Sequence, residues 1–170
     1  MSESRPSDSS WPRYTTRLFP PYRFVPGQSP HPRRDPKGHS YGQPEPQLAA
    51  FPPEHWRQAE EYLYGIDLYN YAYWWECHEV FESYWHAVGH KTDQGNFFQA
   101  LIQLAAANLK HYIGNCEATA NLARNGLARL EQLPRHYMGV EISVLEEALR
   151  RYFDGKGIFP RVRLSTPDGS

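Results

Sequence analysis

Apolar residues recur at steps of three and four positions over most of the chain between residues 54 and 153. This spacing places them on one face of an α-helix. The pattern is interrupted four times, and it predicts five helices over approximately residues 54–69, 73–87, 93–113, 116–133 and 141–153. Since each helix has one apolar face to bury, we expect an all-α, single-domain bundle.

Residues at the predicted helix ends support these boundaries. Thr92 and Asn115 each precede an apolar stretch, where a short polar side chain accepts a hydrogen bond from the first helical turn. Gly89 follows the second stretch, and glycine is common where a helix ends in a left-handed conformation. We expect Asn70 and Tyr71 to separate the first two helices, because one helix over 54–88 would be unusually long for a globular domain.

A weak internal similarity appears when the chain is aligned with itself at a shift of 41 residues. The shift pairs Leu68 with Leu109, Tyr71 with Tyr112, Glu76 with Glu117, and Phe81 with Leu122. It predicts that the first and second helices, and then the third and fourth, form two stacked helical hairpins of similar design. The fifth helix would cover them, since one hairpin cannot bury its own apolar face.

The N-terminal region has a different composition. Residues 1–50 hold ten of the fifteen prolines and no helical periodicity, which predicts an extended arm whose first dozen residues are disordered. Aromatic residues between 18 and 42 favour docking of the arm across the helical domain, which we place at 51–164. They are Phe19, Tyr22, Phe24 and Tyr41. Residues 158–164 are expected to form an extended strap without a strand partner, followed by a disordered tail over 165–170.

Composition limits the expected partners and the expected location of the protein. The net charge is −1 and 22% of the residues are charged, so no nucleic-acid or membrane partner is expected. No run approaches the roughly 20 apolar residues that span a bilayer, and the N-terminus has no signal-like apolar region, which favours a cytoplasmic protein. Cys77 and Cys116 lie in apolar helical patterns without a CxxC motif, and we interpret both as buried, reduced thiols.

The segment 74–86 concentrates polar chemistry in an otherwise apolar helix. It contains three carboxylates, two histidines and three tryptophans. His78, Glu82 and Trp85 follow one another at four and three positions, so they share one stripe of the second helix. Glu76, Glu79 and His86 lie on neighbouring faces of the same helix.

The third helix carries two glutamines that we expect to face this stripe. An antiparallel pairing across residues 88–91 brings Gln99 near Glu82 and Gln103 near His78. A buried amide without a partner costs roughly 1–3 kcal/mol, which favours a hydrogen-bonded network roofed by Trp85. The first interpretation of the network is structural, and the second is a small-molecule or metal pocket.

The arm holds further candidates in His31, Asp35 and His39. They could orient ligands from a turn, whereas an ordinary polar surface loop with Asp35 starting a turn is the alternative. His78 and Glu82 can reach one ion, but the spacing matches neither the zinc-hydrolase motif nor the Glu-x-x-His pairs of di-iron bundles. A divalent metal is therefore not favoured, and the sequence assigns no cofactor.

These motifs resemble those of a bacterial family called domain of unknown function 309. The resemblance covers about Tyr62 to Leu133 and rests on Trp75-Glu76-Cys77-His78-Glu79-Val80-Phe81-Glu82 with Trp85, then Gln99-Ala-Leu-Ile-Gln103-Leu-Ala-Ala and Gly114-Asn115. The arm around 21–27 and 31–40 is similar to an extension in one branch of the family. The resemblance implies an all-helical fold, and it implies His78, Glu79, Glu82, Trp85, Gln99 and Gln103 as motif positions. It implies no activity, and Cys77 and Ala100 stand where alanine and glycine are expected.

Two functions follow as hypotheses. The first is a binding or interaction module that offers its polar pocket to a small ligand or peptide. The second is a metal-dependent or acid-base enzyme, hydrolase-like, that uses His78 and Glu82, with His31 or His39 of the arm as further contributors. Convergence of the arm residues on His78 and Glu82 favours the enzyme. We also expect Glu82→Ala to destabilise the fold by a few kcal/mol, because it would leave buried donors without an acceptor.

Overall fold

The computed structural model describes residues 11–167, and it confirms a mostly α-helical bundle. Of the segments predicted to be disordered, residues 1–10 and 168–170 lie outside this range. Residues 11–12 and 165–167 are described, and the Ser165 N–H donates to the Gly139 carbonyl at 2.8 Å. The elements are η1 (Pro53–Gln58, a 3-10 helix), α1 (Glu60–Asn70), α2 (Trp74–Val88), α3 (Asp93–Tyr112), α4 (Cys116–Leu130), β1 (His136–Tyr137), β2 (Val140–Glu141) and α5 (Ile142–Phe153). Within residues 11–167, no helix is both long enough and apolar enough to cross a bilayer.

The predicted helix caps are confirmed. The Thr92 hydroxyl accepts a hydrogen bond from the Gly95 N–H at 2.9 Å, and Asn115 Oδ1 accepts one from the Ala118 N–H at 3.1 Å. Gly89 follows α2 with φ +91°, a conformation that a side chain disfavours. These local signals explain why the boundaries of α2 and α3 lie within one residue of their predicted positions.

The first predicted helix is wrong in one respect, because it is two elements. Ala59 has φ −86° and ψ 85°, which breaks the helical path between η1 and α1. The buried Trp56 packs against the turn at Gly139, where an added Cβ would lie 2.6 Å from the indole ring. This contact with a residue far away in the sequence positions η1, and local periodicity does not report it.

The sequence interpretation missed a small β-hairpin between α4 and α5. β1 and β2 pair antiparallel around Met138 and Gly139, which have φ 46° and 83°. Two positive φ values at the central residues are typical of a type I′ turn. The hairpin also corrects the prediction that the strap has no strand partner, since Val140 forms an isolated antiparallel bridge with Leu164.

The core lies where α3 packs between α2 and α4. On the α2 side, Tyr84 stacks on Phe98 with ring centroids 5.1 Å apart. On the α4 side, Gly126 allows close approach, since a Cβ there would lie 2.8 Å from Leu104. Cys77 is buried as expected, but Cys116 is exposed, because it is the first residue of α4 and faces solvent.

Buried polar side chains on α1 bind both extended segments of the chain. Asn70 donates to the Val162 carbonyl at 2.8 Å and accepts from the Val162 N–H at 2.7 Å, which confirms that the C-terminal segment docks as an extended strap. The fully buried Asp67 carboxylate accepts from the backbone N–H groups of Tyr14 and Thr15 at 2.8 and 3.0 Å. Extended chain has no internal partners for its N–H groups, so these side chains supply them.

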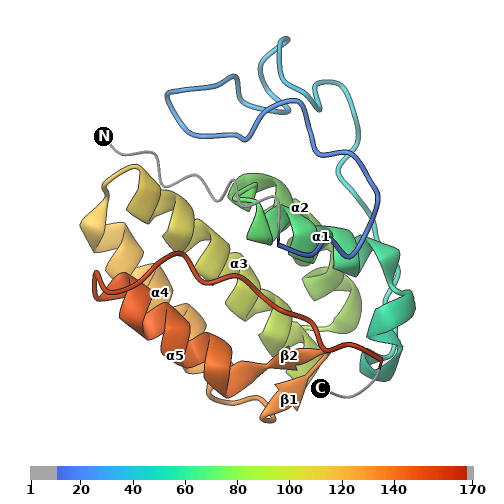
Figure 1. Ribbon diagram of the computed structural model, residues 1–170. Coiled ribbons are helices and arrows are strands. Elements are labelled where there is room, and N and C mark those ends of the chain that lie inside the picture. Colours follow the sequence, from blue (N-terminus) through green and yellow to red (C-terminus); the bar gives the residue numbers. More distant parts are fainter. Residues whose placement is uncertain (1–10, 168–170) are drawn as a thin grey trace.

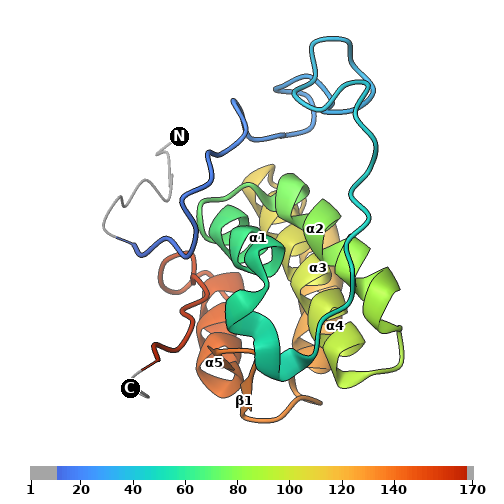
Figure 2. The same ribbon diagram turned by 90° about the vertical axis from the view of Figure 1, so that its right-hand side faces the viewer.

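The arm continues from this anchor and loops out beyond α1 and α2, on the side of the molecule away from α5 (Figures 1 and 2). Phe19 stacks on Tyr73 with centroids 4.8 Å apart, and Phe24 packs edge-on against Trp75 at 5.6 Å. Tyr41 is half exposed and does not anchor the arm as predicted. The arm therefore forms a wall over one face of α2, and the candidate site lies behind this wall.

Candidate functional site

A buried carboxylate on α2 holds the middle of the arm. Glu76 Oε1 accepts from the Phe24 N–H at 2.8 Å and lies 2.9 Å from Nε2 of His39. The side chains of Glu76 and His39 are each only 4% exposed. Burial raises the pKa of the Glu76 carboxyl, and the hydrogen bonds from His39 and Phe24 oppose that rise. The second carboxylate oxygen is buried and has no hydrogen-bond partner within residues 11–167.

A second contact between the arm and α2 is an arginine–carboxylate pair. The Arg33 guanidinium bonds to both carboxylate oxygens of Glu79, with Nη2 at 2.9 Å from Oε1. Its Nη1 donates to the Gln43 carbonyl at 2.8 Å, so the side chain also ties the two ends of the loop together. The hydrogen bond with Glu79 raises the pKa of Arg33. Bidentate pairing of this kind fixes orientation as well as position.

The arm and α2 together enclose a polar pocket of about 450 Å³. The arm contributes a loop rich in histidine and arginine, and α2 contributes its polar face. The lining residues are His31, Arg33, Arg34, Glu45, Pro46, Trp75, His78, Glu79, Glu82, Ser83 and His86. The pocket is therefore made by two segments that are far apart in the sequence, and it depends on the docked position of the arm.

Within the pocket, His78 is held by two acceptors. Its Nε2 lies 2.8 Å from Glu82 Oε2, and its Nδ1 lies 3.1 Å from the Trp75 carbonyl oxygen. A carbonyl and a carboxylate both accept hydrogen bonds, so the ring satisfies both contacts when each nitrogen carries a proton. Both ring nitrogens are therefore engaged by acceptors, which leaves neither nitrogen free to act as a general base. Both side chains of the pair are partly exposed, which lets solvent or a ligand reach them.

His31 has the opposite hydrogen-bond pattern. Its Nδ1 accepts from the backbone N–H groups of Arg33 and Arg34, each at 3.2 Å. The proton of the neutral ring therefore lies on Nε2, which is a donor without a partner among the described residues. The neighbouring Arg34 is exposed and forms no ion pair within residues 11–167. His31 and Arg34 thus leave donors available at the pocket wall.

The structure brings some of the predicted arm residues to His78 and Glu82 and separates others. His31 lines the same pocket, and both His31 and His78 contact the Trp75 ring, at 5.5 and 6.0 Å. His39 is instead buried against Glu76. Asp35 accepts from the Lys37 N–H at 2.9 Å, which is the turn-forming role of the alternative interpretation.

The predicted glutamine network is wrong. Among the described residues no hydrogen bond joins Gln99 or Gln103 to His78 or Glu82, and the Gln103 side-chain oxygen is buried without a partner. The reason is rotational. The face of α2 that packs on α3 carries residues such as Phe81 and Tyr84, and His78 and Glu82 lie to one side of it, facing the arm.

Trp85 does not roof the pocket either. Its indole stacks on the His90 ring at 3.6 Å with an interplanar angle of 6°, just beyond the end of α2. His86 Nδ1 lies 3.2 Å from His90 Nε2, and His86 Nε2 lies 3.7 Å from Glu82 Oε1. The polar face therefore continues from His78 to His90 as a row of side chains. Within residues 11–167, no three histidine, cysteine or acidic side chains are grouped to hold a metal ion.

Sequence reasoning missed the residues that attach the arm, chiefly Arg33, Asp67 and Glu76. The sequence pattern indicates Glu76 only as a side chain on a neighbouring face of α2. A signal was present, since Glu76 precedes the buried Cys77 and lies one turn before Val80, so it falls beside the core stripe. A carboxylate at such a position needs a buried donor, and here donors come from the arm.

Comparison with known protein families gives a match that covers part of the described residues. Residues 62–122 match the family described as "Domain of unknown function (DUF309)". The match runs from α1 into α4 and includes all of α2, whereas the arm lies outside it. No curated protein matches the chain. Residues 62–122, which supply the α2 side of the pocket, therefore belong to the domain of unknown function 309 family.

Proposed function

We propose that the protein is a binding module that holds a small polar ligand between the arm and α2. The observation that carries this proposal is the shared pocket, which is lined by His31 and Arg34 of the arm together with His78 and Glu82 of α2. Its volume of about 450 Å³ lies within the range of about 300–1,000 Å³ that is usual for small-molecule sites.

The remaining hydrogen-bonding groups indicate the chemistry of the ligand. Arg33 and Glu79 neutralise each other, and Arg34 and the His31 Nε2–H are among the donors that remain. Glu45 and the half-exposed Glu82 supply acceptors at the same pocket. A ligand that carries a carboxylate or phosphate for Arg34 and a donor for Glu82 would satisfy both sets.

A ligand screen on the full chain tests the proposal. Small polar compounds are first screened for those that raise the melting temperature of the wild type. The affinity of each such compound is then measured by calorimetry for the wild type, Arg34→Glu and Lys37→Glu. Arg34→Glu should weaken binding by about tenfold or more, since it replaces a donor by a like charge. Lys37→Glu makes the same charge change in the same loop, outside the pocket, and should leave the affinity unchanged. Equal effects of the two substitutions would contradict the proposal.

The second candidate function is acid-base catalysis by His78 and Glu82. The 2.8 Å contact between them supports it, because a hydrogen-bonded carboxylate orients an imidazole. In this version His78 acts as an acid on the bound ligand. If the wild type converts a bound compound chemically, and His78→Gln still binds that compound but no longer converts it, the result would favour the enzyme. Binding without conversion at any pH would favour the module.

A further inference from the structure

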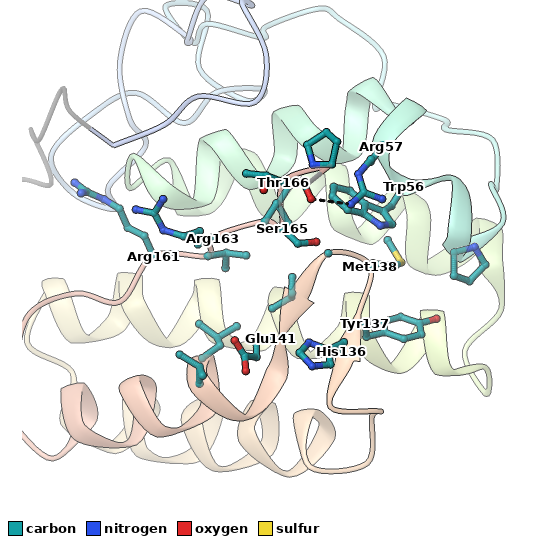
Figure 3. Close-up of a pocket in the computed structure, with 18 of the residues that line it drawn as sticks. Trp56, Arg57, His136, Tyr137, Met138, Glu141, Arg161, Arg163, Ser165 and Thr166 are labelled. Carbon is teal, nitrogen blue, oxygen red and sulfur yellow. Dashed lines mark hydrogen bonds between the residues drawn. The ribbon is translucent and has the colours of Figure 1, made fainter. Parts of the chain in front are cut away.

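A second concave surface lies away from the arm pocket and shares none of its lining residues. It is a groove of about 840 Å³ bounded by η1, the β-hairpin, the first turns of α5 and the C-terminal strap (Figure 3). Nothing in the proposed ligand site uses it.

The floor of the groove is apolar. Trp56, Val140 and Leu145 are buried beneath it, and Ala148 adds a small side chain on α5. Val144 also lines the groove and is 58% exposed, so part of the apolar lining faces solvent. An apolar surface of this kind inside a concave site favours a partner that covers it.

Arginines occupy one edge of the groove. The Arg57 guanidinium lies over the Trp56 ring at 4.3 Å, and Arg163 lies over the Trp11 ring at 4.4 Å. Neither has a carboxylate partner among residues 11–167. Arg161 stands beside Arg163, and its Nε donates to the Asn70 carbonyl. Because stacking holds a guanidinium flat, its N–H groups are pre-oriented for a carboxylate.

The acidic residues that line the groove form no ion pair with Arg57 or Arg163 among residues 11–167, so they do not neutralise the positive charge of the arginine edge. Glu141 lies on the opposite side, at the hairpin, 3.8 Å from Arg135. Glu54 on η1 is the other carboxylate in the lining. Figure 3 shows Arg57 at one end of the upper edge and Arg161 and Arg163 at the other, with Ser165 and Thr166 between them. Cations separated in this way suit carboxylates that are spaced along a chain.

We propose that this groove docks an acidic, apolar segment of a partner polypeptide. Apolar side chains of that segment would cover Val144 and the floor, and its carboxylates would pair with Arg57 and Arg163. The open groove and the spacing of its cations favour a peptide chain over a compact ligand with one charged group. The charge complementarity would set the orientation of the peptide.

A display selection tests the proposal, with a random peptide library as probe and the immobilised full chain as target. Enriched peptides should combine acidic with aliphatic or aromatic residues. Their affinity, measured by fluorescence anisotropy, should fall about tenfold or more in the Arg57→Glu/Arg163→Glu double variant. Arg124→Glu on α4 makes the same kind of charge change away from the groove and should leave the affinity unchanged.

Val144→Asp provides an independent variant, because an exposed helix position tolerates the substitution without loss of the fold. It should weaken the same peptides by a similar factor, since it places a like charge on the apolar floor. No enrichment, enrichment of basic peptides, or equal affinity for the wild type and Val144→Asp would each overturn the proposal.

Discussion

The Nε2 atom of His39 lies 2.9 Å from Oε1 of Glu76, and this contact joins the arm to α2 through two buried side chains. The Phe24 N–H donates to the same oxygen. The arm is thus held by a buried polar contact as well as by aromatic packing. Since the arm forms one wall of the candidate pocket, Glu76 controls the pocket without lining it.

Glu76→Ala should detach the arm, because it removes the acceptor for two buried donors. The expected loss in the free energy of unfolding is about 2–4 kcal/mol. Amide hydrogen exchange should accelerate in residues 20–43 more than in α3. Glu76→Gln keeps an acceptor oxygen and is the matched control. Unchanged exchange of the arm in Glu76→Ala would mean that other contacts hold it.

The pH dependence of Glu76 has a defined sign. Burial raises its pKa above the ordinary 4.5, so the folded protein binds this proton more tightly than the unfolded chain. Its contribution to stability is therefore full at acid pH, and it is lost as the pH rises from about 4.5 through the folded-state pKa. Relative to Glu76→Gln, which does not ionise, the wild type should lose melting temperature over that window. A constant difference would contradict the raised pKa.

The pair of Arg33 and Glu79 should show charge-swap rescue. Arg33→Glu places two carboxylates face to face, which should speed hydrogen exchange in the loop 31–43. The double variant Arg33→Glu/Glu79→Arg restores opposite charges and should recover part of the protection. Lys37→Glu, in the same loop, serves as the charge control. If the double variant recovers no protection, opposite charges alone do not hold the loop. The bidentate geometry of an arginine at position 33 would then be required, because the swapped pair keeps the charges but changes the geometry.

The helices could be predicted from the sequence because their signals are local. Caps such as Thr92 and Asn115, and the apolar steps between them, act within one turn. Features that depend on distant residues could not be predicted. The break at Ala59 follows from Trp56 meeting Gly139, and the bridge of the strap follows from Val140 meeting Leu164.

The candidate site was predicted in part for the same reason. The contact of His78 with Glu82 is a one-turn relationship on a single helix, and the sequence indicates it directly. The predicted partners of His78 and Glu82 on α3 were wrong. Antiparallel pairing predicts which residues of α2 and α3 lie at the same height along the helix axes, but it does not predict how α2 is rotated about its own axis. The arm takes the place assigned to Gln99 and Gln103, through pairs that are far apart in the sequence, such as Arg33 with Glu79 at a separation of 46 residues.

Glu82→Ala should now have little effect on stability, which revises the expectation from the sequence. The Glu82 side chain is 45% exposed and pairs with a partly exposed His78, so the loss is expected to be below about 1 kcal/mol. Thermal denaturation at neutral pH measures it, with Glu82→Gln for comparison. A decrease of several kcal/mol in the free energy of unfolding would contradict this expectation, because it would require Glu82 to belong to a buried hydrogen-bond network.

The two cysteines should differ in reactivity. The Cys77 thiol is buried and burial raises its pKa, whereas Cys116 is exposed at the start of α4. A thiol reagent should therefore modify one group per native chain and both after unfolding. Cys116→Ser should abolish the native reaction. Rapid modification of Cys77 in the native protein would contradict the packing of α2 against the core.

The position of a bound ligand tests the central claim most directly. Backbone amide chemical shifts of the full chain are recorded during titration with a compound from the ligand screen. The pocket between the arm and α2 predicts the largest changes at Arg34, Trp75 and His78, with small changes at Val144 in the separate groove. Changes concentrated at Val144, or binding that leaves Arg34 and His78 unperturbed, would contradict the claim.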